Sequence, residues 1–500
     1  MDESGNTTSP APTEDPGLGS LADCLFPALV DVWNKDDPDH VGATSLLHDP
    51  AHPAATVFLL GRDGPDPRDA APRLAWMRQV PGENVPLPPL RGKAIAHDQL
   101  RITVVPGGLE IENRGTPKVF IDQQALAVGS KRRIGPGSVI QIRGHSIFLF
   151  VLRPLVLTIP GRGLGPPHAF GQPDADLIVG EGPVAWRFRA QLAQAALAGG
   201  CALIQGESGT GKELAAGGIH RRWGRIGKLV AQNAATLQPT VAELTLFGSR
   251  KDWPNKGTPA RTGWVFEALD GTLFLDEIGE VPEAMQARLL RVLEGWAANM
   301  GESLERRVDV RILGGTNKDL SAVLRLDFWK RFVFTVLTPS LALRLEDIPL
   351  LARYLVLREG RTNPKLVEPF VTTDSAGRQQ VQFSPALVLA MLGAHYPGNL
   401  RDLRNLLVRA MTEQSEGPLR PPADMAPWTK RAPPEPEATH DVDDLLAGLR
   451  GGRHLTEAAI RQVLAKADGN QSEAAKLLGI TRDKLRWWMR KHRIDRPGDD

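Results

Sequence analysis

The chain has 500 residues, more than the usual size of one domain, about 50 to 250 residues, so several domains are expected. Hydrophobic residues make up 42% and charged residues 24%, values near the average of soluble globular proteins, which excludes wholesale disorder and fibrous repeats. With 60 basic and 58 acidic side chains the net charge is +2, which excludes a uniformly basic nucleic-acid-binding protein but permits a small basic module.

Residues 1–20 are rich in Ser, Thr, Pro and acidic residues and lack apolar periodicity, which predicts a disordered tail. This segment has no basic start typical of export signals, and the most apolar run, 146–159, is interrupted by Arg153 and Pro154. Only Cys24 and Cys201 are present, too few for a disulfide framework or a cysteine zinc site. We therefore expect a cytoplasmic protein with no membrane partner.

Short apolar runs separated by turn residues follow within residues 21–153. They comprise 56–60, 100–104, 109–111, 119–121, 139–142 and 147–151. Gly107 and Gly108 separate two of these runs, as in a hairpin. The spacing predicts an N-terminal β-sandwich. Prolines and glycines in residues 154–175 then indicate a linker.

Residues 176–340 alternate strand and helix patterns. Strand candidates at 202–204 and 273–275 and a helical pattern at 285–293 predict a central α/β domain with a parallel sheet. Helical patterns dominate residues 341–415 and predict an α-helical lid. A second Pro-rich linker, 416–440, separates an all-α module at 441–500.

A glycine-rich loop follows the first strand of the α/β domain and opens a helix. Its residues are Gly206, Glu207, Ser208, Gly209, Thr210, Gly211 and Lys212. The glycines let backbone N–H groups surround phosphate oxygens, and Lys212 supplies a cation, so this P-loop predicts ATP binding. Glu213 stands where Ser or Thr usually binds magnesium. The alternative is a glycine-rich turn that binds no nucleotide.

Two adjacent carboxylates end the strand 273–275. Asp276 is placed to hold Mg²⁺, and Glu277 is placed to orient the water that attacks the terminal phosphate. By itself this pair could be an ordinary strand end. Together with the P-loop it predicts ATP hydrolysis.

The P-loop, the carboxylate pair and four further segments resemble the AAA+ domain of sigma-54-dependent transcriptional activators. The further segments are Leu246–Gly248, Gly315–Leu320, Glu346–Leu351 and Tyr396–Leu403. The resemblance implies that Asn317 is the sensor I residue, that Arg401 is the sensor II arginine, and that Asn233 restrains Glu277. It also implies self-assembly into a hexameric or heptameric ring. Arg325 and Arg331 are the candidates for the arginine that reaches a neighbouring subunit's ATP.

Basic charge is concentrated near the C-terminus, where the segment from His454 to Arg496 contains ten Lys or Arg and five Asp or Glu. A short helix and a glycine turn precede Thr481, which can cap a second helix, so the pattern predicts a helix-turn-helix. The alternative is a solvated helix face. The segment Gly469–Ile480 also resembles the Fis-type DNA-binding domain of these activators. The residues predicted to contact DNA are Thr481, Arg482, Lys484, Arg486, Arg490 and Lys491.

The N-terminal strands resemble a forkhead-associated domain, through Arg62, the strand 99–102 and Asn113. That resemblance implies a phosphoprotein partner. Ala96 and His97 replace the Ser-Arg pair of the family, which removes two groups suited to phosphate. The alternative is a sandwich used for docking or for control within the chain.

One loop departs from the activator family. Family members carry Gly-Ala-Phe-Thr-Gly-Ala after the segment that corresponds to Leu246–Gly248, and that loop contacts RNA polymerase with sigma-54. Residues 249–263 lack the motif, and Trp253 is the only aromatic residue there. The loop therefore predicts that the protein is a DNA-tethered ATPase that controls another partner. The alternative is a regulator that remodels sigma-54 polymerase.

Overall fold

The computed structural model describes residues 25–48, 56–62, 71–92, 94–159, 168–318, 324–373, 377–425 and 428. The predicted tail, 1–20, and the predicted DNA-binding residues, Thr481 to Lys491, lie outside the described residues. The chain divides into two compact units, Met1–Pro434 and Glu435–Asp500. All the elements below belong to the first unit.

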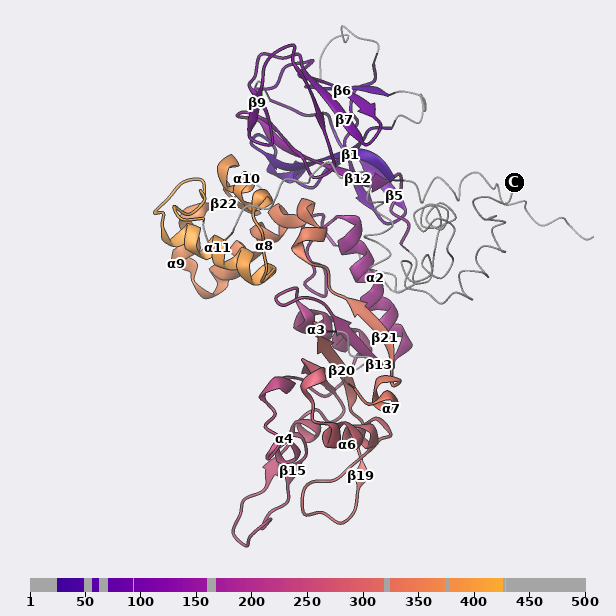
Figure 1. Ribbon diagram of the computed structural model, residues 1–500. Coiled ribbons are helices and arrows are strands. Elements are labelled where there is room, and N and C mark those ends of the chain that lie inside the picture. Colours follow the sequence, from indigo (N-terminus) through magenta and orange to yellow (C-terminus); the bar gives the residue numbers. More distant parts are fainter. Residues whose placement is uncertain are drawn as a thin grey trace, which may run out of the picture. The chain divides into compact units, whose positions relative to one another are not determined.

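Strands β1 to β12 form two antiparallel sheets, coloured indigo to purple in Figure 1. Their orders are β5-β4-β2-β1-β12-β11-β8-β9 and β10-β7-β6-β3. Leu29 and Phe148 from the first sheet and Ile102 and Ile111 from the second belong to one buried core, so the two sheets share an interior. We call this part the strand region. Its strands are β1 Leu25–Asn34, β2 Thr44–Leu46, β3 Val57–Leu60, β4 Met77–Val80, β5 Glu83–Pro86, β6 Leu100–Val105, β7 Gly108–Asn113, β8 Val119–Ile121, β9 Gln124–Leu126, β10 Lys131–Ile134, β11 Val139–Ile142 and β12 Ser146–Pro154, and η1 spans Pro38–His40.

A five-stranded parallel sheet, with the order β14-β17-β20-β13-β21, is the centre of the next part. Leu273 and Leu275 of β17 enter one core, whereas Phe274 enters another, so both faces of the sheet are covered. The sheet strands are β13 Cys201–Gln205, β14 Leu229–Asn233, β17 Thr272–Asp276, β20 Arg311–Thr316 and β21 Phe332–Leu337. The helices are α2 Pro183–Ala198, α3 Lys212–Trp223, α4 Ala242–Phe247, α5 Trp264–Glu267, α6 Glu283–Leu293 and α7 Leu326–Trp329, with η2 Ala234–Thr236 and η3 Ile278–Glu280.

Two small hairpins extend from this part and are visible beside α4 and α6 in Figure 1. One pairs β15 Gly248–Ser249 with β16 Arg261–Thr262, and the other pairs β18 Trp296–Ala297 with β19 Arg306–Arg307.

Helices α8 to α11 form the helical segment, coloured orange to yellow in Figure 1. The buried residues of α11 recur at helical spacing and face the core: Leu403, Leu406, Leu407, Ala410 and Met411. The elements are η4 Leu341–Leu343, η5 Leu345–Asp347, α8 Ile348–Thr362, α9 Pro364–Val367, η6 Glu368–Phe370, β22 Val371–Thr373, β23 Gln379–Val381, α10 Pro385–Gly393 and α11 Leu400–Thr412. The β22–β23 hairpin interrupts the helices that the apolar pattern of residues 341–415 predicts.

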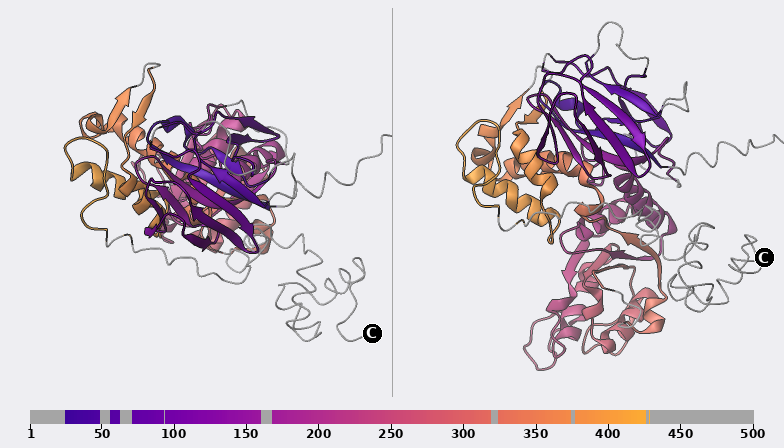
Figure 2. Two further views of the ribbon diagram at one scale, coloured as in Figure 1. Left: turned by 90° about the horizontal axis from the view of Figure 1, so that it is seen from above. Right: turned by 45° about the horizontal axis from the view of Figure 1, so that its top comes forward.

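The strand region and the helical segment share a core. Val30 of β1 and Leu149 of β12 belong to the same buried cluster as Leu351 of α8 and Met391 of α10. The Trp33 indole N–H donates to the Phe383 carbonyl at 2.8 Å. Figure 2 shows these strands and helices from two further directions.

Candidate functional site

The P-loop connects β13 to α3 as the sequence predicts. Gly209 and Gly211 have φ values of 74° and 102°, a left-handed conformation that favours glycine. No side chain caps the start of α3, whose N-cap is Gly211. The first backbone N–H groups of this helix are therefore available to an anion.

Lys212 connects the P-loop to the carboxylate pair. Its side-chain Nζ donates to the Gly206 carbonyl at 3.2 Å and lies 3.9 Å from both Asp276 Oδ1 and Glu277 Oε1. Because β13 and β17 flank β20 in a parallel sheet, these groups meet at its carboxyl edge, where ligands of such sheets bind. The structure thus brings the predicted cation and carboxylates together.

Asp276 and Glu277 lie where β17 ends. Asp276 Oδ1 accepts a hydrogen bond from the Glu277 backbone N–H at 3.1 Å, and Glu277 has left-handed dihedrals, φ 52° and ψ 49°. A Cβ atom added to Gly315 would lie 2.5 Å from Asp276 Oδ1, so glycine leaves room for this carboxylate. A helix start, a lysine and carboxylate oxygens fit the phosphates of a nucleotide and a magnesium ion. Within the described residues no cluster of three or more His, Cys, Asp or Glu forms a metal site.

The Thr210 side chain is buried and forms its hydrogen bonds within the protein. Its buried hydroxyl donates to the Glu207 carbonyl at 2.8 Å and shares a 2.7 Å hydrogen bond with the Thr338 hydroxyl. Glu213 is exposed on α3. Sequence reasoning did not identify Thr338, because it lies 128 positions from Thr210.

The two predicted asparagines lie at the ends of β14 and β20, which flank β17 in the sheet. Asn233 ends β14 opposite Asp276, and its Oδ1 accepts from the Ala235 N–H at 2.8 Å. Asn317 directly follows β20 and is exposed. Among the described hydrogen bonds, none joins Asn233 to Glu277, so its restraining role stays a prediction.

Arg401 lies in the first turn of α11, next to the P-loop. The backbone N–H of Leu400 donates to the Gly209 carbonyl at 3.1 Å. The Arg401 side chain is exposed. Asn399, which the sequence analysis assigned no role, bonds Glu207 at 2.9 Å; the only available signal was its place in the segment Tyr396–Leu403.

The candidate trans-acting arginines lie on the surface at either end of α7. Arg325 Nη2 contacts Asp327 Oδ2 at 2.9 Å, and this hydrogen bond raises the pKa of Arg325 and lowers that of Asp327. Arg331 Nη2 lies 3.5 Å from Glu294 Oε1. Both guanidinium groups are exposed.

The loop between β15 and β16 is fixed at its base by a second loop, residues 298–305. The Arg250 N–H donates to the Met300 carbonyl at 3.1 Å, and the Met300 N–H donates to the Gly248 carbonyl at 3.0 Å. Trp253 is half-buried against Gly301, where an added Cβ atom would lie 2.4 Å from the indole ring. The exposed charged residues of the loop are Arg250, Lys251, Lys256 and Arg261, with Asp252, and they alternate with exposed uncharged residues such as Pro254 and Ala260.

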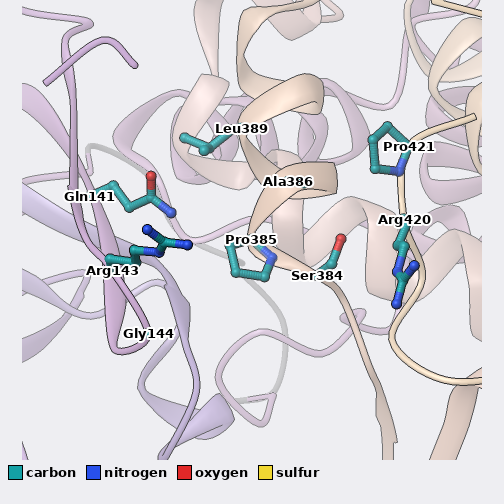
Figure 3. Close-up of a pocket in the computed structure, with 9 residues that line it drawn as sticks. All are labelled: Gln141, Arg143, Gly144, Ser384, Pro385, Ala386, Leu389, Arg420 and Pro421. Atoms are coloured by element: carbon teal, nitrogen blue, oxygen red, sulfur yellow. The ribbon is translucent and has the colours of Figure 1, made fainter. Parts of the chain in front are cut away.

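A cavity of about 550 Å³ lies between the strand region and the helical segment. Gln141 and Arg143 of the strand region face Ser384, Pro385 and Leu389 of the helical segment across it, as Figure 3 shows. None of its lining residues belongs to the P-loop or the carboxylate pair.

Comparisons with known proteins identify two modules in this chain. Residues 178–339 match the sigma-54 interaction domain, and residues 457–492 match the bacterial regulatory proteins of the Fis family. The transcriptional regulatory protein ZraR of Escherichia coli is 33% identical over 62% of this chain and 67% of its own length. The chain belongs to the sigma-54-dependent transcriptional activator family.

Other members of the activator family have similar sequence identity to this chain and similar coverage of it. Regulatory protein AtoC of Escherichia coli is 32% identical over 61% of this chain and 65% of its own length, and the Nif-specific regulatory protein of Azotobacter vinelandii is 35% identical over 61% and 57%. A solved structure of NtrX from Brucella abortus in complex with ADP is 27% identical over 64% of this chain and 71% of that chain, with a TM-score of 0.43. The strand region lies outside both matched modules. Within the described residues no helix has the length and apolar composition needed to cross a bilayer.

Proposed function

We propose that this protein is a DNA-binding transcriptional regulator that hydrolyses ATP in a ring assembly. The observation that carries the proposal is the position of Lys212 Nζ, which is 3.9 Å from both Asp276 and Glu277 at the carboxyl edge of the parallel sheet. In this arrangement the P-loop amides and Lys212 bind the phosphates, and the Glu277 carboxylate orients the attacking water. A magnesium ion held by Asp276 would neutralise charge on the phosphates.

The lid and ring assignments are part of the same proposal. Arg401 at the start of α11 adds a cation beside the P-loop, and Asn317 adds a polar group at the end of β20. Arg325 or Arg331 acts on the ATP of the neighbouring subunit, because both are exposed at the edges of α7. Asn233, at the end of β14, restrains Glu277 between turnovers.

Paired substitutions in the full chain test the ATPase assignment. We expect Lys212→Ala to abolish ATP binding, because it removes the cation of the P-loop, and Glu277→Gln to bind ATP without hydrolysing it. Equilibrium titration with a fluorescent ATP analogue measures binding, and phosphate release measures turnover. Unchanged phosphate release by Glu277→Gln would contradict the assignment.

The match to the Fis family supports DNA binding by the C-terminal module. Thr481, Arg482, Lys484 and Arg486 begin the predicted second helix and would contact bases, whereas Arg490 and Lys491 would contact phosphates. The match to the sigma-54 interaction domain favours RNA polymerase with sigma-54 as the partner of the ATPase.

A second candidate function follows from the loop between β15 and β16. Trp253 packs against Gly301 and is half-buried, and Arg250, Lys251, Asp252 and Lys256 are exposed around it, so this loop presents a surface unlike the exposed aromatic tip of the family. That surface favours a DNA-tethered regulator that uses nucleotide for assembly or for control of another partner. ATP-dependent formation of open complexes with sigma-54 polymerase separates the two candidates, because only the first produces it.

For the strand region we propose control within the chain, with phosphothreonine binding as the alternative. Arg73 Nη2 contacts Asp98 Oδ1 at 3.0 Å, directly after Ala96 and His97, so a carboxylate occupies the edge at which a phosphate would bind. In contrast, β12 contributes Arg153 to a contact with Glu346 of η5 at 3.3 Å. A titration with phosphothreonine peptides tests the alternative.

A further inference from the structure

Residues at the start of α11 donate hydrogen bonds to the P-loop. The Asn399 side-chain Nδ2 donates to Glu207 Oε2 at 2.9 Å and to the Ser208 carbonyl at 3.1 Å. The Leu400 N–H donates to the Gly209 carbonyl at 3.1 Å. Two residues therefore bond three consecutive residues of the P-loop. The contact is close, since a Cβ atom added to Gly209 would lie 2.1 Å from the Gly398 carbonyl oxygen.

The Asn399 amide uses both of its functional groups. While its Nδ2 bonds the P-loop, its Oδ1 accepts from the Leu341 N–H at 2.9 Å, where η4 begins. The residue is 1% exposed, so water does not replace these partners. A carboxylate of the same shape cannot donate, and an aliphatic side chain can neither donate nor accept. Asparagine thus joins the P-loop, the segment after β21 and α11.

The backbone of Asn399 is strained. Its dihedrals, φ 50° and ψ −124°, are rare for residues with a Cβ atom, whereas glycine reaches positive φ readily. Strained residues persist where the surrounding structure holds them, and they concentrate at functional sites. The presence of Asn at a position that favours Gly indicates that its amide has a role.

We propose that Asn399 is a positioning residue for nucleotide, which rests on the proposed ATPase function. In a planar trans peptide the C=O and N–H groups point in opposite directions. By holding the Ser208 and Gly209 carbonyls, Asn399 and Leu400 turn the N–H groups of Gly209 and Thr210 away from α11, and these N–H groups bind phosphate. The same contacts fix the start of α11 and place Arg401 relative to the P-loop.

Asn399→Gly tests the proposal, because it removes the amide and relieves the backbone strain. We expect the Kd for a fluorescent ATP analogue to rise about tenfold, as the loss of one to two buried hydrogen bonds implies. The thermal unfolding midpoint should stay close to that of the wild type. Asn363→Gly is the matched control, because the Asn363 amide bonds Glu359 within the helical segment, and it should leave the Kd unchanged.

A double-mutant cycle with Arg401→Ala tests whether Asn399 acts through the position of α11. Arg401→Ala alone should weaken binding, and the same substitution should have an effect at least about threefold smaller in the Asn399→Gly background. If the two substitutions raise the Kd by independent factors, the proposal is overturned. An unchanged Kd for Asn399→Gly would also overturn it. A wild type that binds no ATP would instead overturn the proposed function, so the two failures are distinguishable.

A reversal of the hydrogen bond tests the contact with Glu207. Asn399→Asp should weaken ATP binding more than Asn399→Gly does, because it places a second carboxylate beside Glu207. Adding Glu207→Gln supplies an N–H donor and should restore binding to within about threefold of the wild type. Absence of this rescue in a protein with a normal unfolding midpoint would contradict the contact as the source of the effect.

Discussion

Arg153→Met should destabilise the chain, because it removes one partner of a buried ion pair between the strand region and η5. The Arg153 side chain is 2% exposed and that of Glu346 is 11% exposed, and their charged atoms lie 3.3 Å apart. At this distance the attraction is about 5 kcal/mol for an effective dielectric constant near 20. Breaking such a pair by removing one partner costs about 3 to 5 kcal/mol, since the remaining charge is buried without compensation.

The destabilisation should depend on pH. Burial raises the pKa of Glu346 above its ordinary value of 4.5, whereas Arg153 lowers it. Without Arg153 the folded-state pKa rises further, so the variant loses stability as pH rises from 4.5 through that higher pKa. Well below pH 4.5, Glu346 is protonated in both the folded and the unfolded state, and the variant should approach the wild type.

Urea unfolding at acidic and neutral pH measures the effect as a shift of the midpoint. Glu346→Gln in the Arg153→Met background should recover most of the loss, because it removes the uncompensated charge. Arg133→Met, on the exposed side of β10, is the surface control and should change the free energy of unfolding by less than about 0.5 kcal/mol. A loss of under about 1 kcal/mol that is equal at both pH values would refute the reasoning.

Three further predictions concern assembly, DNA and the loop. The ATPase rate per subunit should rise with protein concentration and fall in Arg325→Ala or Arg331→Ala, since a neighbour supplies the arginine; a rate that stays flat on dilution argues for a monomeric enzyme. Lys491→Ala should lower the slope of log affinity for DNA against log salt concentration by about one unit, and Arg482→Ala should reduce the specificity for the DNA sequence. Binding that does not respond to salt would show that the predicted helix is a solvated face. If sigma-54 polymerase is the partner, Trp253→Ala should reduce open-complex formation, because it loosens the loop from Gly301, whereas Lys365→Ala on α9 should not; equal activity of the two variants would show that Trp253 does not position the loop.

The sequence predicted the parts of the site that are contiguous. The P-loop and the Asp276-Glu277 pair each occupy one short segment with a fixed relation to strand and helix, so their pattern is complete in the sequence. Thr338 and Asn399 were missed because their roles come from contacts with residues more than a hundred positions away. Such contacts are set by tertiary packing and leave no local pattern.

The strand region illustrates the same limit. The apolar runs predicted β3, β6, β7, β8, β11 and β12, but not β2, β4, β5, β9 and β10, nor β1, which pairs with both β2 and β12. Pro27 and Asp31 within β1 argue against a buried strand. In the structure Asp31 is fully buried, its Oδ2 lies 2.8 Å from His40 Nδ1, and burial raises its pKa. A buried partner elsewhere in the chain makes the acidic residue compatible with the strand.

The core that joins the strand region to the helical segment affects how this regulator can be engineered. Val30 and Leu149 cover Leu351 and Met391, so a chain cut between β12 and α2 would leave apolar side chains of both parts in water. Such a truncated chain is expected to aggregate. Replacing the strand region by fusing another domain at residues 154–175 would fail for the same reason, unless the replacement supplies a matching apolar surface. In this chain the strand region and the helical segment have to be exchanged together or redesigned at their shared core.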